Sequence, residues 1–463
     1  MNMFRNISKA LENIVKKNRA EENNITNNSI FDVMQHYTQV GEYSVGAPEG
    51  TPGDKDFDLI VYKNDNGILY QALRPKKAEN LAPLFVRKFE PRLNRFRAFQ
   101  NKKNGRRFIV EEHLDEFINY VKNYTRTNTN SINIGIITDT HQKDVDSLTS
   151  YGRLGLLHLK EFNYLEERGF LKLKVHLGDW IDGSDPGLVD EQELINLRNC
   201  FSSKRIDYAL IKGNHDENDK FDALHEMLPS FPEREFEDIM WTNMYRQHNI
   251  HYISRQHGVA YFDYGDLRII MINTSDVPYI LDNNGKKKYN TQHTLAIRED
   301  QVQEIIEILE KSVNKQIIFM GHAVPIDRKG MNSLKYNGRS LHELMVAFNQ
   351  REKGYLNSHD VPLEYTLTNK FDFSNVVKGK IIAYFAGHAH AEDQYRINSI
   401  QYITFNCSAL VSLPDSNKYN QRYNRQVDQR TEYAGYVVNV DLDKKLLQVF
   451  GYGAASKRRV YRI

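Results

Sequence analysis

Six short runs of apolar and β-branched residues, each ending in polar residues, constrain the fold of this chain most. In chain order they read INIGIITDTH, LKVHLGDWIDG, DYALIKGNHDE, LRIIMINTSD, QIIFMGHAVP and IIAYFAGHAH, all after residue 131. An apolar run of this length, bounded by glycine or polar residues, predicts a buried strand. Helical patterns lie between the runs, for example from Arg298 to Leu309. The alternation predicts an α/β fold whose sheets are covered by helices.

The ends of these predicted strands carry side chains that bind metals or transfer protons. In α/β folds the chemistry collects at strand ends. A lone histidine there is more often structural than a ligand, but five successive strand ends of this kind are unexpected by chance. The candidate residues are Asp139, His141, Asp179, Asp182, Asn214, His215, Asp216, His322, His388 and His390.

These donors predict a site for two metal ions. Cys200 and Cys407 are the only cysteines, too few for a disulfide framework or a zinc–thiolate site. Carboxylates, imidazoles and an amide oxygen suit divalent Mn, Fe or Zn. These groups exceed the needs of one ion, and a shared carboxylate can hold two ions about 3.5–4 Å apart. The one-residue gaps in DTH and HAH let both side chains of a pair point to one side of the chain.

The motifs DTH, GDWID, GNHD, GH and GHAH, in this order, resemble the calcineurin-like metallophosphoesterases. Their signature is Asp-x-His, Gly-Asp-x-x-Asp, Gly-Asn-His-(Asp/Glu), a lone His and Gly-His-x-His. The resemblance spans residues 132–463 and implies a metallophosphoesterase β-sandwich flanked by helices. The segment from Tyr436 to Ile463 is also similar to the closing strands of bacterial and phage-borne members.

The resemblance implies a role for each site residue. One metal would lie on Asp139, His141, Asp179 and His390, and the second on Asp179, Asn214, His322 and His388, with Asp179 bridging. His215 would face the substrate as general acid or as a phosphate hydrogen-bond donor, and Asp182 would orient its ring. A water between two cations has its pKa lowered toward ~7, so hydroxide is available to attack phosphorus at neutral pH.

The first 131 residues precede this pattern and predict two further parts. Residues 1–29 have helical spacing of apolar residues among many charges, which predicts an amphipathic helix that docks on a partner or caps its own domain. Residues 30–131 predict a small α+β accessory or anchoring domain. It contains a hairpin around residues 64–67, a helix over 111–122 and a polar linker at 125–131. Residues 132–463 form the predicted catalytic domain.

The net charge of the chain does not indicate a class of partner, but one segment is strongly basic. The net charge is +2, which indicates neither nucleic acid nor membrane. Residues 87–107 hold nine basic residues against Glu90 alone, interleaved with aromatics. They predict either a groove for a phosphate-bearing polymer or a solvated face. The same two alternatives, contact with an anionic substrate or a solvated surface, apply to the basic residues Lys457, Arg458 and Arg459. No signal sequence and no run of eighteen apolar residues occurs, which predicts a soluble protein, cytoplasmic or virion-associated.

These observations favour a dinuclear metal-dependent phosphoesterase, more specifically a phosphodiesterase. Three substrate classes remain open. In the first, the enzyme is mounted on a phage tail or a cell surface, with residues 1–131 as a virion anchor, and cleaves a teichoic-acid-like wall polymer. In the second, it cleaves nucleic acid, like the recombination-repair nucleases. In the third, it cleaves a small diester. Richness in Asn, Lys, Ile and Tyr suggests an AT-rich genome and favours the first. The alternative from another class is a structural or receptor-binding virion protein with a vestigial metal site.

Overall fold

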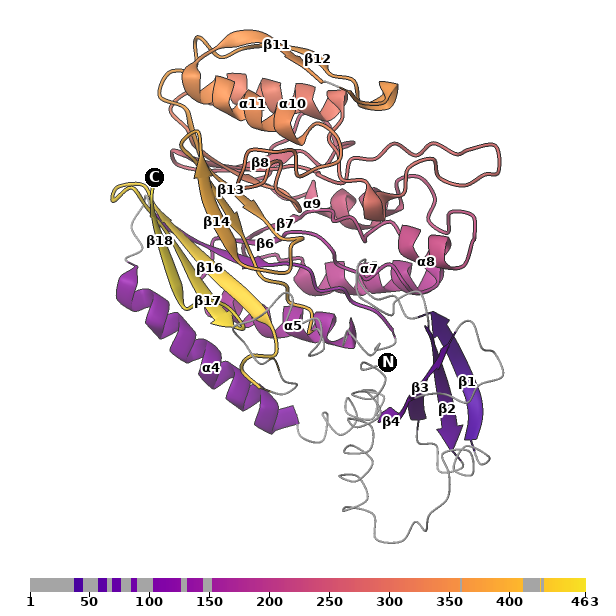
Figure 1. The fold of residues 1–463 in the computed structure, drawn as a ribbon. Coiled ribbons are helices and arrows are strands. Elements are labelled where there is room, and N and C mark those ends of the chain that lie inside the picture. The colour runs from indigo at the N-terminus through magenta and orange to yellow at the C-terminus, as the bar shows by residue number, and fades with distance from the viewer. Residues whose placement is uncertain are drawn as a thin grey trace. The chain divides into compact units, whose positions relative to one another are not determined.

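The computed structural model describes most of the chain after residue 102 and four strands before it. The described residues are 37–44, 57–64, 69–75, 85–89, 103–125, 131–144, 152–358, 360–410, 425 and 429–463. They divide into two compact units, Met1–Lys102 and Lys103–Ile463, and each unit is considered by itself. Figure 1 shows the ribbon, coloured along the chain.

The first unit contains a four-stranded antiparallel sheet in the order β1-β2-β3-β4. The predicted hairpin is confirmed, because β2 and β3 pair with Lys63 opposite Leu69. The predicted helix within residues 1–29 and most of the basic segment at 87–107 lie outside the described residues. The strands are β1 (Tyr37–Ser44), β2 (Phe57–Asn64), β3 (Leu69–Pro75) and β4 (Phe85–Phe89).

Helix α4 (Lys103–Tyr124) is longer than the helix predicted at 111–122. Its buried residues Phe117 and Val121 join the core of the second unit. The Phe117 ring packs edge-on against Tyr452, with 5.6 Å between centroids. Apolar burial on that face therefore groups α4 with the second unit, although it precedes the polar stretch at 125–131. The predicted domain limits at residues 29 and 131 stay predictions.

The second unit contains two six-stranded sheets, and the first of them has the order β18-β17-β16-β5-β6-β7. β5, β6 and β7 are parallel, so their carboxyl ends lie at one edge. The remaining strands are antiparallel to their neighbours. Its strands are β5 (Ser131–Ile137), β6 (Leu173–His176), β7 (Asp207–Leu210), β16 (Ala434–Asp441), β17 (Leu446–Gly453) and β18 (Arg458–Arg462).

The second sheet has the order β14-β15-β13-β10-β9-β8. β9, β10, β13 and β15 are parallel, and the outer strands β8 and β14 run antiparallel to them. All six strands predicted from the sequence are present. The strands are β8 (Ala260–Tyr264), β9 (Leu267–Met271), β10 (Gln316–Met320), β13 (Lys380–Ala386), β14 (Asp393–Ile397) and β15 (Ile400–Thr404).

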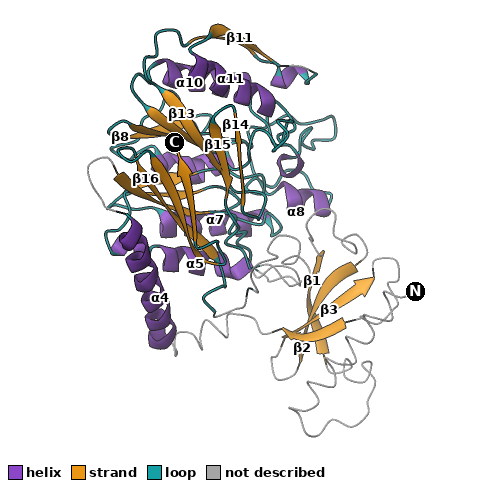
Figure 2. Ribbon diagram, turned by 60° about the vertical axis from the view of Figure 1, so that its left-hand side comes forward, coloured by secondary structure: helices purple, strands orange, loops and turns teal. Residues whose placement is uncertain are grey.

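The two sheets face each other across a shared core, as β10 illustrates. Ile318 and Met320 belong to the cluster that also contains Ile134 and Ile136 of the first sheet. Ile317 and Phe319 belong instead to the cluster beneath α10 (Glu299–Glu310) and α11 (Gly338–Gln350). Because successive side chains of a strand point to opposite faces, this apolar run is buried on both sides. The predicted β-sandwich flanked by helices is therefore confirmed (Figure 2).

Helices and short elements complete the second unit. Helices α10 and α11 cover the outer face of the second sheet, and a two-stranded sheet of β11 and β12 follows α11 (Figure 1). Among the described residues, no helix combines the length and apolar character needed to cross a bilayer. The α-helices are α5 (Gly155–Phe162), α6 (Tyr164–Glu167), α7 (Gly187–Phe201), α8 (Asp219–Leu224), α9 (Thr242–Met244), α10 (Glu299–Glu310) and α11 (Gly338–Gln350). The short elements are η1 (Gly152–Leu154), η2 (Glu237–Trp241), η3 (Thr291–His293), β11 (Lys353–Asn357), η4 (Leu363–Tyr365) and β12 (Thr368–Asp372).

Candidate metal centre

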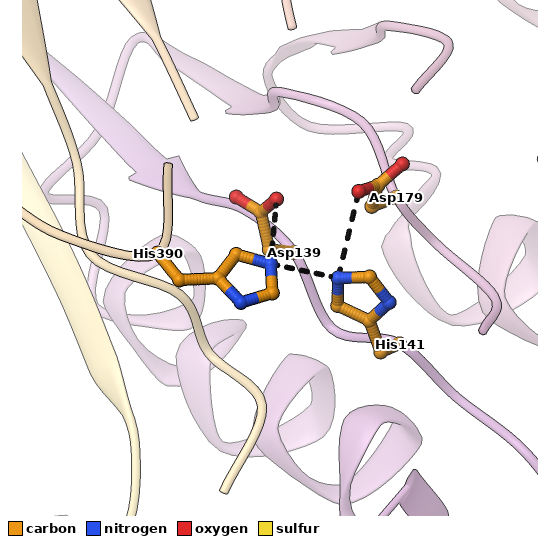
Figure 3. Close-up of side chains that lie close together, drawn as sticks. All are labelled: Asp139, His141, Asp179 and His390. Atoms are coloured by element: carbon orange, nitrogen blue, oxygen red, sulfur yellow. Dashed lines mark hydrogen bonds and ion pairs between the residues drawn. The ribbon is translucent and has the colours of Figure 1, made fainter. Parts of the chain in front are cut away.

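The loops after β5, β6, β7, β10 and β13 bring the predicted ligands together, although Asp139 and His390 lie 251 positions apart in the sequence. A first cluster contains Asp139, His141, Asp179 and His390, whose ligand atoms all lie within 4.8 Å of one another. Nε2 of His141 is 2.9 Å from Nε2 of His390 and 3.5 Å from Oδ2 of Asp179. Nε2 of His390 lies 3.4 Å from Oδ1 of Asp139. Figure 3 shows these side chains converging from separate segments.

A second cluster contains Asp179, His322 and His388, again within 4.8 Å. Nε2 of His322 lies 3.2 Å from Oδ2 of Asp179 and 3.2 Å from Nδ1 of His388. Oδ1 of Asn214 is 2.9 Å from the same His322 nitrogen. Since Oδ2 of Asp179 faces His141 on one side and His322 on the other, this carboxylate stands between the two clusters. The seven predicted ligands thus form two sets that share Asp179.

The protonation pattern of these rings fits metal binding. Nδ1 of His322 lies 2.9 Å from the carbonyl oxygen of Leu177 and donates to it, so Nε2 is the nitrogen whose lone pair becomes available to a cation that displaces its proton. Nδ1 of His141 faces Oδ1 of Asp182 at 3.4 Å, which favours the same tautomer. Carboxylates and carbonyls commonly orient ligand histidines in this way. Lone pairs that converge with carboxylate oxygens repel one another unless cations stand among them, so this donor set fits two divalent ions.

Charge in the two clusters leads to the same conclusion. Burial alone would raise the pKa of Asp139, but the hydrogen bond and charge of His390 outweigh it and lower the pKa to about 2. Burial alone would lower the pKa of His322, but the charge of Asp179 raises it to about 9. The buried carboxylates therefore draw positive charge onto neighbouring imidazoles. A bound cation supplies that positive charge directly.

Five of the seven predicted ligands have left-handed backbone conformations. Their φ angles are 52° for Asp139, 42° for His141, 54° for Asp179, 64° for His388 and 50° for His390. Each such residue costs on the order of 1–3 kcal/mol and persists only when its surroundings hold it. Strain of this kind concentrates at functional sites. The loops that carry the candidate ligands therefore adopt strained backbone conformations that place these side chains in the two clusters.

Two glycines allow the ligand loops to approach one another closely. A Cβ on Gly213 would lie 2.1 Å from the backbone nitrogen of Asp179 and 2.2 Å from its Oδ1. A Cβ on Gly387 would lie 2.5 Å from Oδ2 of Asp139. Neither space accommodates a methyl group. The glycines of GNHD and GHAH are thus required by packing against the candidate ligands Asp179 and Asp139, which follow other strands.

His215 lies beside the first cluster, but Asp182 contacts it differently from the expectation. The ring Nδ1 of His215 donates to the backbone carbonyl of Asp182 at 2.9 Å. The Asp182 carboxylate instead faces His141 and accepts from Lys220 at 2.9 Å. Burial lowers the pKa of His215 to about 3, so the free ring is neutral with Nε2 as an acceptor. A general-acid role then requires a proton that the negative charge of a bound phosphate would stabilise.

Other residues at the centre had no assigned role in the sequence. The buried Asp216 carboxylate accepts from the backbone nitrogens of Trp180, Ile181 and Gly213, at 2.8, 3.2 and 2.7 Å. It thereby ties the GDWID and GNHD loops together. The carbonyl of Gln292 accepts from Nδ2 of Asn214 at 3.0 Å and directs Oδ1 toward His322. A backbone carbonyl gives no sequence signal, whereas Asp216, the last residue of GNHD, is among the candidates from the sequence and gains its role from the structure.

Lys457, Arg458 and Arg459 lie at or beside β18, which β16 and β17 separate from β5. The Arg458 guanidinium stacks 3.9 Å above the ring of Tyr124, and Lys457 lies 4.6 Å from the ring centroid of Tyr120. These cation–π contacts attach the C-terminal strand to α4.

Comparison with known proteins identifies the family. The model of the calcineurin-like phosphoesterase family matches residues 132–392, more than half of the chain. A dimetal phosphatase from Danio rerio is similar in structure, with 12% identity, a TM-score of 0.45, and coverage of 71% of this chain and 98% of that one. A purple acid phosphatase from yellow lupin seeds has 10% identity, a TM-score of 0.39, and coverage of 88% and 58%. A putative 5'-nucleotidase from Staphylococcus aureus has 14% identity, a TM-score of 0.37, and coverage of 72% and 54%.

No curated protein matches the sequence, and all three TM-scores lie below 0.5. The assignment accordingly rests on the family model and on the ordered strand-end motifs, which the fold brings into two clusters around Asp179. Both support a metal-dependent phosphoester hydrolase. The chain belongs to the calcineurin-like phosphoesterase family.

Proposed function

We propose that this protein is a dinuclear metal-dependent phosphodiesterase. The observation that carries the proposal is the placement of Asp179 between two ligand sets, Asp139, His141 and His390 on one side and Asn214, His322 and His388 on the other. A shared carboxylate is how proteins hold two ions close enough to act on one phosphoryl group. The open donor set, without thiolates, suits a catalytic rather than a closed structural site.

The site residues have separate roles in the proposed hydrolysis. When bound, two divalent ions would act as Lewis acids on the phosphoryl group and make water a stronger nucleophile near neutral pH. The backbone nitrogen of His215 donates to Oδ1 of Asp179 at 3.0 Å and fixes the bridging carboxylate. The side chain of His215, positioned by the Asp182 carbonyl, donates a proton to the leaving oxygen once substrate charge has protonated the ring. Asp182 keeps His141 in its ligand tautomer.

The test is hydrolysis of a chromogenic phosphodiester and the matching monoester by metal-stripped protein after addition of Mn, Zn, Fe, Mg, Ca or Ni. We expect Mn, Zn or Fe to restore diester cleavage in preference to monoester cleavage. Asp179→Ala should lose both activity and metal, because its carboxylate contacts both clusters. His215→Ala should retain two ions and should lose more activity on an alkyl diester than on the chromogenic one, whose good leaving group needs no acid. Folded protein that binds no metal and cleaves neither ester would contradict the proposal and favour a structural virion protein with a vestigial site.

For the substrate, we propose a teichoic-acid-like wall polymer, with residues 1–131 attaching the enzyme to a phage tail or a cell surface. This proposal rests on the chain's composition and on the similarity of its C-terminal segment to phage-borne members, and its assay is phosphate-diester cleavage in purified wall polymer. The nuclease alternative rests on the basic segment at 87–107. Neutralising Arg92, Arg95 and Arg97 together should weaken polyanion binding and spare a small diester. Unchanged binding at low salt would remove that support.

A further inference from the structure

His176, the last residue of β6, lies beneath the first ligand cluster without being a ligand. Its ring is fully buried and stacks on Trp180, with 3.6 Å between centroids and 21° between planes. Nδ1 lies 3.2 Å from the backbone nitrogen of Gly178, and Nε2 lies 3.2 Å from Oγ1 of Thr140. One imidazole thus contacts the loop after β5 and the loop after β6.

The direction of each hydrogen bond follows from its partners. The Gly178 N–H can only donate, so Nδ1 of His176 is the acceptor and Nε2 carries the hydrogen. Nε2 therefore donates to Thr140, whose own hydroxyl hydrogen is left for the carbonyl of Trp180 at 2.9 Å. Burial lowers the pKa of His176 to about 3, so the neutral ring that this pattern requires is the stable form. A continuous chain of bonds then runs from Gly178 through the ring and Thr140 to Trp180.

The residues held by this chain flank strained ligands. Thr140 separates Asp139 from His141, and Gly178 and Trp180 enclose Asp179. All three ligands have positive φ angles. Backbone bonds also join the two loops, from the Asp139 nitrogen to the Gly178 oxygen at 3.0 Å and from the His141 nitrogen to the Asp179 oxygen at 3.1 Å. The ring adds a side-chain connection at the two positions where the loops must stay strained.

We propose that His176, acting with Thr140, is a positioning residue that sets the spacing between the Asp139–His141 pair and the bridging Asp179. It thereby determines how tightly the centre holds its metals. The inference rests on the proposed function, since it assumes that these side chains bind metal. Residues that orient metal ligands commonly change metal affinity 10–100-fold when they are replaced.

The experiment measures Mn²⁺ binding calorimetrically, with folding followed separately by thermal unfolding. His176→Phe keeps an aromatic ring against Trp180 but removes both hydrogen bonds, and we expect it to weaken Mn²⁺ binding 10–100-fold. His176→Asn retains an acceptor near Nδ1, and His176→Gln retains a donor near Nε2. Each should lose less affinity than His176→Phe. Thr140→Val should weaken binding on its own, and the double variant with His176→Phe should lose less than the sum of the two single losses, because each change removes the bond between the two side chains.

His342→Phe is the matched control. His342 is also buried and makes two side-chain hydrogen bonds, from Nδ1 to the Tyr402 hydroxyl at 2.7 Å and from Nε2 to Asn398 at 3.0 Å. It lies in α11, away from the ligand loops, so its replacement should reduce stability and leave Mn²⁺ affinity unchanged.

The possible failures are distinguishable. Wild-type protein that binds no Mn²⁺ overturns the proposed function and the inference with it. Wild-type protein that binds two ions, with folded His176→Phe, His176→Asn and His176→Gln all within twofold of it, overturns the inference alone. Equal losses of affinity in His176→Phe and His342→Phe would also overturn it, because a general loss of stability would then explain the effect.

Discussion

Replacing Gly213 with alanine tests whether close approach of the GNHD loop positions the bridging carboxylate. The new Cβ would lie 2.1 Å from the Asp179 nitrogen, and real Cβ contacts are not closer than 3.0 Å, so the two loops must separate by at least 0.9 Å. The φ angle of Gly213 is not in the left-handed region, so space alone decides the effect. A misplacement of about 1 Å can cost about 10²-fold in rate, and overpacking typically costs about 1–3 kcal/mol of stability. We expect Gly213→Ala to lose about 100-fold in kcat/KM for a small phosphodiester while remaining folded.

The assay compares metal-loaded wild type, Gly213→Ala and the control Gly354→Ala by steady-state kinetics, with denaturant unfolding in parallel. At Gly354, in β11, the nearest atom to an added Cβ is in the Phe371 ring at 3.5 Å, an ordinary contact. That variant should retain wild-type activity. If Gly213→Ala keeps more than a third of the wild-type kcat/KM, the spacing between this loop and Asp179 does not limit catalysis.

Three further predictions concern other parts of the molecule. Burial alone would raise the pKa of Glu217, but Lys212 outweighs it and lowers the pKa to about 2 from an ordinary value near 4.5. This shift corresponds to roughly 3 kcal/mol of stability, which is present above pH 4.5 and lost as the pH falls toward 2. Glu217→Gln should remove this contribution at pH 7. Urea unfolding from pH 7 to 2.5 should show the free energies of unfolding of the two proteins converging. His215→Gln should reduce cleavage of an alkyl diester about 100-fold or more but a nitrophenyl diester much less, because a good leaving group needs no acid; equal losses in the two kinetic series would argue against proton donation. Arg458→Met should lower the free energy of unfolding by about 0.5–1 kcal/mol through loss of the contact with Tyr124, and an unchanged value in denaturant unfolding would show that this contact contributes nothing.

The sequence predicted the elements that local pattern controls. Apolar runs such as Ile381–Ala386 gave the strands of both sheets, because burial on both faces requires a continuous apolar run. Helix α4 shows the limit of local pattern. A polar stretch follows this helix and suggests a domain boundary. Its packing partners Phe450 and Tyr452 nevertheless lie more than 300 residues later in the chain. Tertiary contacts therefore decide which unit the helix belongs to.

The candidate ligands were also accessible from the sequence, because chemistry restricts which residue types bind metals, and five strand ends carried them in order. Their arrangement was not accessible in the same way. The sequence does not show that the Asp182 carboxylate faces His141 while its backbone carbonyl holds His215, since backbone groups carry no residue identity. His176 likewise reads as part of an apolar strand and gains a role only through Thr140 and Gly178.

By itself, then, the sequence determined the layered α/β fold and the set of groups available for metal binding. Both follow from properties of single residues and near neighbours: hydrophobicity, strand period and donor type. Only the tertiary structure decided that Asp179 stands between two clusters, that five candidate ligands have left-handed backbones and that Gly213 must lack a side chain. These features depend on distances between loops far apart in the chain, which packing of the two sheets sets and local sequence does not encode.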